Sequence, residues 1–93
     1  MELSIVIPVA DDLRIKNCIQ SIDEDVEVVI SMNKPTEEIR SIVRSFGIKY
    51  CEIPERNLGA ALDEGIKVAT NERVLLNDSD CIFKKGCIRL LYD

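Results

Sequence analysis

The feature that most constrains the fold is a regular alternation between short apolar runs and segments with helical periodicity. The apolar runs are rich in β-branched residues and cover residues 3–9, 26–32, 48–53 and a stretch that begins at Val74. Such runs, with few polar interruptions, are typical of strands covered on both faces. Between them, residues 11–22, 36–46 and 57–71 place apolar side chains three and four positions apart, and residues 84–92 form a shorter segment. The alternation predicts a βαβαβαβα chain, an α/β Rossmann-like sandwich of three layers with a mainly parallel four-stranded sheet.

Residues that favour helix ends mark the expected boundaries. Asp11 or Asp12 is expected to cap the first helix and Asn57 the third, since both residue types accept bonds from free backbone N–H groups. Gly47 follows the second helix, where a left-handed residue is favoured. The third and fourth helices are expected to turn one apolar side inward, formed by Leu58, Ala61, Leu62, Gly65, Ile66 and Ala69 in the third and by Cys87, Leu90 and Leu91 in the fourth.

Length and charge exclude several classes of protein. At 93 residues the chain is expected to form one domain, residues 1–93, with a single modest core. It has 12 basic against 17 acidic residues, a net charge of -5, and only 4% aromatic residues. This balance argues against nucleic acid as a partner, which needs a basic surface or a stacking platform. No segment reaches the roughly 20 apolar residues of a membrane span, and no signal-peptide pattern begins the chain, so a cytoplasmic protein is predicted.

The histidine and cysteine content limits the metal and nucleophile chemistry. The sequence has no histidine, so Cys-His and Ser-His dyads are excluded, and a bound metal should have oxygen ligands. Four cysteines, Cys18, Cys51, Cys81 and Cys87, have no Cys-x-x-Cys spacing. We interpret them as small buried apolar residues of a reducing compartment.

The most informative polar residues follow the fourth apolar run. Asp78 and Asp80 stand one residue apart where this strand should end, at the sheet edge where open α/β sheets bind ligands. Two carboxylates there could hold a divalent cation, but they could equally be solvated turn residues. The glycine patterns of dinucleotide-binding and P-loop proteins are absent, which disfavours both classes. A phosphoacceptor receiver domain is also disfavoured, because residues 53–55 provide no Asp after the third strand and no fifth strand follows.

Three motifs together resemble the nucleotide-binding half of the inverting glycosyltransferases of family 2. They are the opening strand of residues 4–9, the helix start at residues 57–59 with Gly65 and Ile66 further along, and the strand end at residues 77–80. The resemblance spans residues 3–91. It implies the GT-A fold with strand order 3-2-1-4, a nucleotide-diphosphate sugar as ligand, and Mn²⁺ or Mg²⁺ as cofactor.

The same resemblance assigns site residues position by position. Asp78 and Asp80 would hold the metal ion, and Asp80, the last carboxylate of the Asp-x-Asp, is the principal ligand. Asp12 falls where the family often has the Glu of an Asn-Glu pair, and Asn33 matches an acidic position that contacts the base. The nucleotide-sugar contacts would be made by Pro8, Val9, Ala10, Asp12, Asn33, Asn57, Gly59 and Asp78.

Family members carry their acceptor-binding half and their catalytic base beyond the region that this sequence matches. We therefore expect a truncated glycosyltransferase-like domain with no catalytic residue of its own and little or no transferase activity alone. The alternative is a non-catalytic α/β module for binding or self-association. In that case the edge of the fourth strand, Val74 to Leu76, or the last helix would form a homodimer.

Overall fold

The computed structural model describes residues 1–92 and has the eight predicted elements in the predicted order. All strands are parallel, and their order across the sheet is β3-β2-β1-β4. The prediction of an α/β fold with a parallel four-stranded sheet is therefore confirmed, as is the strand order that the resemblance implies. The elements are β1 (Leu3–Val9), α1 (Ile15–Gln20), β2 (Glu27–Asn33), α2 (Glu37–Ser45), β3 (Lys49–Ile53), α3 (Leu58–Val68), β4 (Arg73–Leu76) and α4 (Cys87–Tyr92).

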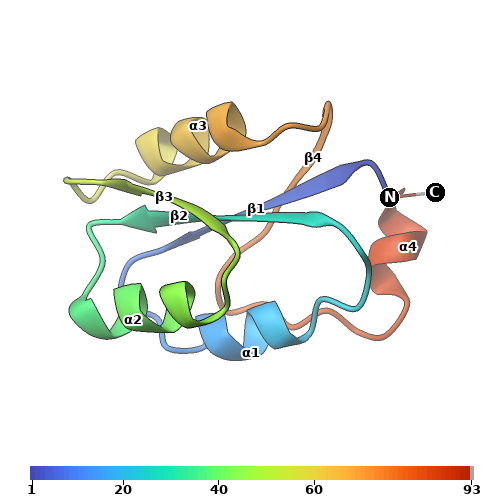
Figure 1. Cartoon of the computed structure of the whole chain (residues 1–93), viewed down its shortest axis with the longest axis horizontal. Helices are drawn as coiled ribbons and strands as arrows, with labels where there is room; N and C mark the ends of the chain where they lie inside the picture. The colour runs from blue at the N-terminus through green and yellow to red at the C-terminus, as the bar shows by residue number, and fades with distance from the viewer. Residues whose placement is uncertain (93) are drawn as a thin grey trace.

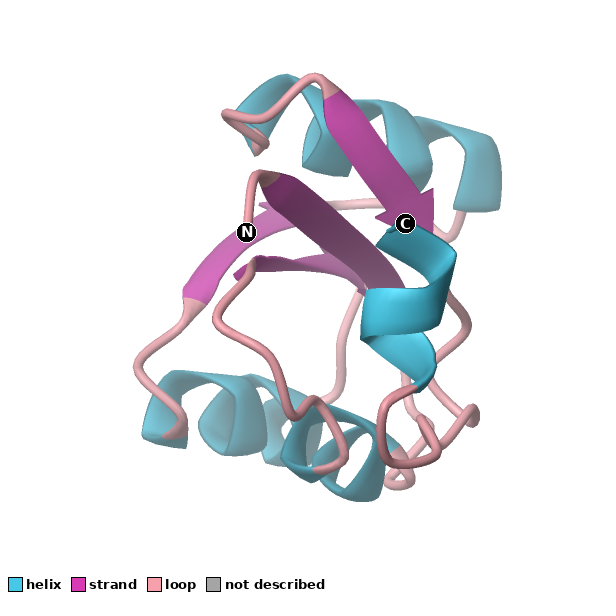
Figure 2. Ribbon diagram, turned by 90° about the vertical axis from the view of Figure 1, so that its right-hand side faces the viewer, coloured by secondary structure: helices cyan, strands magenta, loops and turns pink. Residues whose placement is uncertain are grey.

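Helices cover both faces of the sheet (Figure 1). Helices α1 and α2 lie on one face and α3 lies on the other. The main core fills the space on the α1 and α2 side, where Ile5 and Ile7 of β1 are completely buried. Ile88 of α4 joins this same core. Figures 1 and 2 show α4 at the end of the molecule where the chain begins, beside the sheet.

Helix α3 lies unusually close to the opposite face. A Cβ added to Gly65 would stand 2.4 Å from Cγ1 of Val6, so only glycine allows this approach. The buried Ser31 hydroxyl donates a hydrogen bond of 2.6 Å to the carbonyl oxygen of Ala61 in α3. The small residues of α3 therefore fix the helix directly over β1 and β2.

Two of the expected helix boundaries are confirmed and one is wrong. Asn57 caps α3 through its side chain and Gly47 is left-handed with φ of 65°, both as expected, and Thr36 is observed to cap α2 through its side chain. The first helix begins later than expected: Arg14 occupies the cap position of α1, and no side-chain cap bond is formed. Asp12 is not the cap because its carboxylate instead closes a local turn, accepting the backbone N–H of Arg14 at 3.0 Å.

The expected inward side of the last helix is confirmed for Cys87, which packs against the core, and is wrong for Leu90 and Leu91. Leu90 is 80% exposed and Leu91 59%, whereas Ile88 is buried, because α4 is only six residues long and turns a different side to the core. In α3, Ala61 and Gly65 face the sheet as expected, but Leu58 and Ile66 are exposed.

The cysteine interpretation needs a similar correction. Cys18 alone of the four is fully buried, Cys81 is exposed, and Cys51 and Cys87 are partly exposed. Cys81 lies in a loop that runs over the surface after β4, so it does not fill the core. All four are free thiols.

The sheet has two different edges. β3 is one edge, as its alternating charged residues suggest, and the four-residue β4 is the other. The longest helix, α3, has 11 residues, and none of the helices in residues 1–92 has the length and apolar character needed to cross a bilayer.

Candidate functional site

The candidate site lies where the chain crosses from one half of the sheet to the other. From β1 the chain builds β2 and then β3 on one side, and α3 then returns it to β4 on the opposite side of β1. The carboxyl ends of β1 and β4 meet at this switch point, which is where open α/β sheets bind their ligands. The connection from β1 leads to α1, and the loop after β4 runs along the same helix. A cleft with a volume of about 360 Å³ lies here, at the carboxyl edge of the sheet.

Most of the predicted site residues line this cleft. The structure brings together residues from the ends of β1, β2 and β4, which are 20 to 70 positions apart in the sequence. Those predicted and found in the lining are Pro8, Val9, Ala10, Asp12, Asn33, Asp78 and Asp80, and Asp11, Leu58 and Ser79 also line it. The lining of the cleft therefore combines apolar residues with four carboxylates.

The loop after β4 is held in place by backbone and amide bonds. Asn77 donates its backbone N–H to the carbonyl of Val6 at 3.0 Å, which extends the β1–β4 pairing by one residue. The Asn77 side chain donates to the carbonyl of Asp78 at 3.1 Å, and that same carbonyl accepts the backbone N–H of Cys81 at 3.2 Å. These bonds define the turn that carries the Asp78 and Asp80 carboxylates, and they leave both side chains exposed.

This turn has the composition of a divalent-cation site. Ligand atoms of Asp78, Asp80 and Cys81 all lie within 4.8 Å of one another. Carboxylate oxygens are the ligands that Mg²⁺ and Mn²⁺ prefer, and Mg²⁺ usually takes one or two carboxylates and completes its shell with water and phosphate oxygens. The pair Asp78 and Asp80 fits this requirement. The chain thus has suitable residues for the ion that the sequence resemblance implies.

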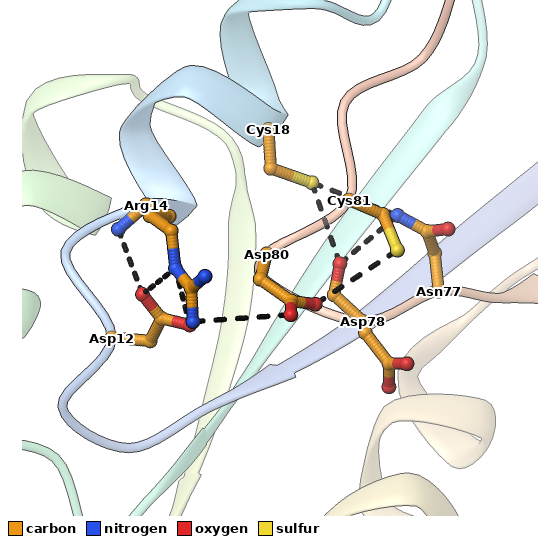
Figure 3. Close-up of polar contacts among 7 residues, drawn as sticks. All are labelled: Asp12, Arg14, Cys18, Asn77, Asp78, Asp80 and Cys81. Atoms are coloured by element: carbon orange, nitrogen blue, oxygen red, sulfur yellow. Dashed lines mark hydrogen bonds and ion pairs between the residues drawn. The ribbon is translucent and has the colours of Figure 1, made fainter.

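An arginine lies beside these carboxylates (Figure 3). Nε and Nη2 of Arg14 each lie 2.9 Å from an oxygen of Asp12, in a bidentate pair, and Nη2 lies 3.8 Å from Oδ2 of Asp80. The hydrogen bonds from Arg14, through its side chain and then its backbone N–H, lower the pKa of Asp12, because they stabilise the charged form. In Figure 3 the Asp80 carboxylate faces Arg14, whereas that of Asp78 points away from it.

The buried thiol of Cys18 contacts the same loop. Cys18 of α1 lies 3.7 Å from the carbonyl oxygen of Asp78, and the Asn77 amide lies 3.6 Å from its sulfur. Burial raises the pKa of Cys18 to about 11, so the thiol stays protonated and acts as a weak donor to the loop. Its position favours a structural role.

The structure places Asn57 and Gly59 outside the cleft lining. Asn57 donates its backbone N–H to Oδ1 of Asn33 at 2.8 Å, while its own Oδ1 caps α3 by accepting from Ala60 at 3.0 Å. It lines a neighbouring cleft between β3 and α3, of about 500 Å³. Asn57 therefore positions Asn33, which does line the site. A Cβ on Gly59 would meet only the Asn57 side chain, at 3.5 Å.

Four residues of this region are not among the predicted site residues: Asp11, Leu58 and Ser79 in the cleft lining, and Arg14 beside Asp80. Leu58 was expected to face the sheet, but this first residue of α3 is 56% exposed and lines the cleft. Arg14 was not considered at all. The signal available was its spacing from Asp12, since an Asp two residues before an Arg can accept from both its backbone and its side chain.

Comparisons with known proteins bear on this arrangement. The family model described as "Glycosyl transferase family 2" matches residues 4–93. A solved structure titled "Crystal structure of S. aureus TarS 1-349" superimposes with a TM-score of 0.87 at 22% sequence identity, covering 99% of this chain and 31% of that one. The present chain thus spans about a third of the TarS chain, and the likeness shows a fold of the GT-A type. No curated protein sequence gives a match.

Proposed function

Since the chain belongs to glycosyl transferase family 2, we propose that the cleft at the carboxyl edge of its sheet binds a nucleotide-diphosphate sugar together with Mn²⁺ or Mg²⁺. The observation that carries the proposal is the composition of the cleft lining, which combines the apolar residues Ala10 and Leu58 with the carboxylates Asp78 and Asp80. Apolar side chains suit a nucleoside, and carboxylates that hold a metal ion suit a diphosphate.

The cation would be held by Asp78 and Asp80, and it would neutralise the negative charge of the bound diphosphate. The remaining residues bind and orient. Asn33 is fixed by Asn57 and presents its amide nitrogen, a hydrogen-bond donor, for the base. The apolar side chain of Leu58, which is exposed and lines the cleft, would cover part of the nucleoside.

We propose further that these 93 residues bind the donor without transferring the sugar. Inverting transfer needs a carboxylate that removes a proton from the acceptor hydroxyl. Among the carboxylates that line the described cleft, Asp11 pairs with Arg56 at 3.5 Å and Asp12 with Arg14. Asp78 and Asp80 are assigned to the metal. The acceptor base is thus expected outside this set of residues.

The test is ligand-dependent thermal stability. Uridine or guanosine diphosphate at millimolar concentration with Mn²⁺ is expected to raise Tm, because a ligand that binds only the folded state stabilises it by mass action. Asp80→Ala is expected to abolish the shift. Ser45→Ala is the control, since Ser45 lies at the exposed end of α2, away from the cleft. If no nucleoside diphosphate shifts Tm of the unaltered chain, donor binding is refuted.

A second candidate function, a self-association module, is favoured by one observation. Within residues 1–92, β4 pairs only with β1, so its outer edge is open, and Leu90 and Leu91 of the nearby α4 are exposed. An open strand edge can pair with another chain. Sedimentation at high protein concentration separates the candidates, because this one predicts a dimer that Leu90→Glu disrupts, whereas donor binding alone predicts a monomer.

A further inference from the structure

The position of Arg14 suggests a role in the cleft beyond an ordinary surface ion pair. Its backbone N–H and its Nε both donate to Oδ1 of Asp12, at 3.0 and 2.9 Å, while Nη2 donates to Oδ2 at 2.9 Å. The side chain is 65% exposed, so packing does not hold it in place. Asp12 alone fixes the direction of the guanidinium, and this direction brings it to Asp80.

The contacts of Arg14 with the two carboxylates differ in kind. The pair with Asp12 is bidentate and short, whereas the approach of Nη2 to Asp80 is 3.8 Å, beyond hydrogen-bond distance. A divalent ion would bind a carboxylate oxygen at about 2.1 Å. An ion on Asp80 would therefore repel the guanidinium and remove the weaker contact, while the bonds to Asp12 could persist.

Resting on the donor site proposed above, we propose that Arg14 is a built-in counter-cation of that site. Without a divalent ion, its guanidinium neutralises Asp80. When the ion binds, Arg14 gives up Asp80, stays anchored on Asp12, and offers its remaining donors to the diphosphate. The bonds to Asp12 use Nε and Nη2, which leaves the N–H groups of Nη1 for a phosphate oxygen. Arg14 thus weakens binding of the metal alone and strengthens binding of the metal with its nucleotide.

The first experiment measures Mn²⁺ binding alone by electron paramagnetic resonance of the free ion. Arg14→Gln removes the competing charge and is expected to tighten Mn²⁺ binding by roughly two- to fivefold, the size expected for an exposed ion pair. Arg56→Gln is the matched control. Arg56 is also exposed and pairs with a cleft carboxylate, Asp11, but it makes no contact with Asp80. An equal effect of both variants would show a general charge effect and overturn the proposal.

The second experiment measures binding of uridine or guanosine diphosphate at saturating Mn²⁺. Here Arg14→Gln is expected to weaken binding several-fold, and Arg14→Lys to recover part of it, because lysine keeps the charge but lacks the planar fork. A residue with only a structural role would not produce effects of opposite sign in the two experiments. Unchanged nucleotide affinity in Arg14→Gln would refute the diphosphate contact.

The outcomes also separate this inference from the proposal on which it rests. If the unaltered chain binds neither Mn²⁺ nor nucleotide, the donor site is refuted, and the role of Arg14 with it. If the unaltered chain binds both and Arg14→Gln binds both equally well, the donor site stands and the inference about Arg14 is overturned. Circular dichroism of each variant verifies that it is folded.

Discussion

Carboxylates occupy both ends of the parallel sheet, but their surroundings differ. At the amino end, Glu27 of β2 accepts four hydrogen bonds: from the Ser4 hydroxyl at 2.7 Å, the Lys49 ammonium at 2.8 Å, and the backbone and hydroxyl of Thr70 at 2.7 and 2.9 Å. Each of its two oxygens therefore has two donors. At the carboxyl end, the polar contacts of the Asp80 carboxylate are Nη2 of Arg14 and Sγ of Cys81, both at 3.8 Å.

The difference indicates what each carboxylate can do. Glu27 joins β1, β2, β3 and the segment before β4 in one network, and its side chain is only 17% exposed. A carboxylate whose oxygens already have donors contributes to stability and has little capacity for a ligand. Asp80 is 45% exposed and has unused acceptor capacity, which is what a metal site needs before its ion arrives. We therefore expect the carboxylate at the amino end to stabilise the fold and those at the carboxyl end to serve the proposed ligand site.

The largest expected effect comes from a change that disturbs both ends together. α3 runs from Asn57 beside the cleft towards Thr70 beside Glu27, and Gly65 fixes its distance from the sheet. Gly65→Ala would drive a Cβ into the buried, stiff side chain of Val6, so we expect a loss of about 1–3 kcal/mol in the free energy of unfolding. Urea denaturation measures it.

Gly59→Ala in the same helix is the matched control. Its added Cβ meets only Oδ1 of Asn57 at 3.5 Å, an ordinary contact, and alanine favours helix, so no loss of stability is expected. A double variant tests the mechanism: Gly65→Ala should cost less in a Val6→Ala background, because the clashing methyl is then absent. Equal costs in both backgrounds would show that steric contact with Val6 is not the cause.

The next largest effect tests the amino end directly. Glu27→Gln keeps the shape of the side chain but turns an NH₂ group towards donors and removes the charge that Lys49 neutralises. We expect a loss of about 1–2 kcal/mol in the free energy of unfolding. This is the contribution of hydrogen bonds to a charged group, reduced because the glutamine oxygen can still accept some of them. Urea denaturation at neutral pH gives the value. A loss as small as that of an ordinary surface change would contradict the structural role of Glu27.

The dependence of the free energy of unfolding on pH also tests the structural role of Glu27. The hydrogen bonds from Lys49, first, and from Ser4 lower the pKa of Glu27 from 4.5 to about 2. Because the folded-state pKa lies below the unfolded value, the unfolded chain binds more protons between these values. This stabilisation is complete above about pH 4.5 and is lost as pH falls towards 2. Glu27→Gln should flatten the slope in this window, leaving the contributions of Asp12 and Glu52, whose pKa values are also lowered. An unaltered slope would show that another group controls acid unfolding.

The fold was predictable because its signals are local and repeated. The buried runs of β1 and β2 and the caps at Thr36 and Asn57 each follow from a few neighbouring residues. The side of α4 that faces the core was not predictable from the sequence. A helix of six residues is too short for its apolar pattern to define one side, so the orientation depends on packing against the rest of the core. The position of Asp78 and Asp80 at a strand end was also predictable, because only the end of β4 had to be located.

What the sequence could not reveal is long-range pairing. The network around Glu27 joins residues from position 4 to position 70, and no local pattern indicates that Ser4, Lys49 and Thr70 meet there. The approach of Arg14 to Asp80 is of the same kind, because it depends on where the loop after β4 passes α1. The binding roles of the cleft residues are still predictions, which the ligand experiments address.

The smallest expected effect on stability belongs to Asp80→Asn, the counterpart of Glu27→Gln at the other end of the sheet. Asp80 is exposed and makes no short hydrogen bond within residues 1–92, so the change in the free energy of unfolding without ligand should stay within about 0.5 kcal/mol. With Mn²⁺ and a nucleoside diphosphate, the same variant should lose most of the ligand-induced rise in Tm, which Glu27→Gln should keep. The same thermal melts thus distinguish the two variants: Glu27→Gln should lower Tm but keep the ligand-induced rise, and Asp80→Asn should keep Tm but lose that rise. If Asp80→Asn instead destabilises the free protein as much as Glu27→Gln, the Asp80 carboxylate is a structural group, and the division of labour between the two ends of the sheet is wrong.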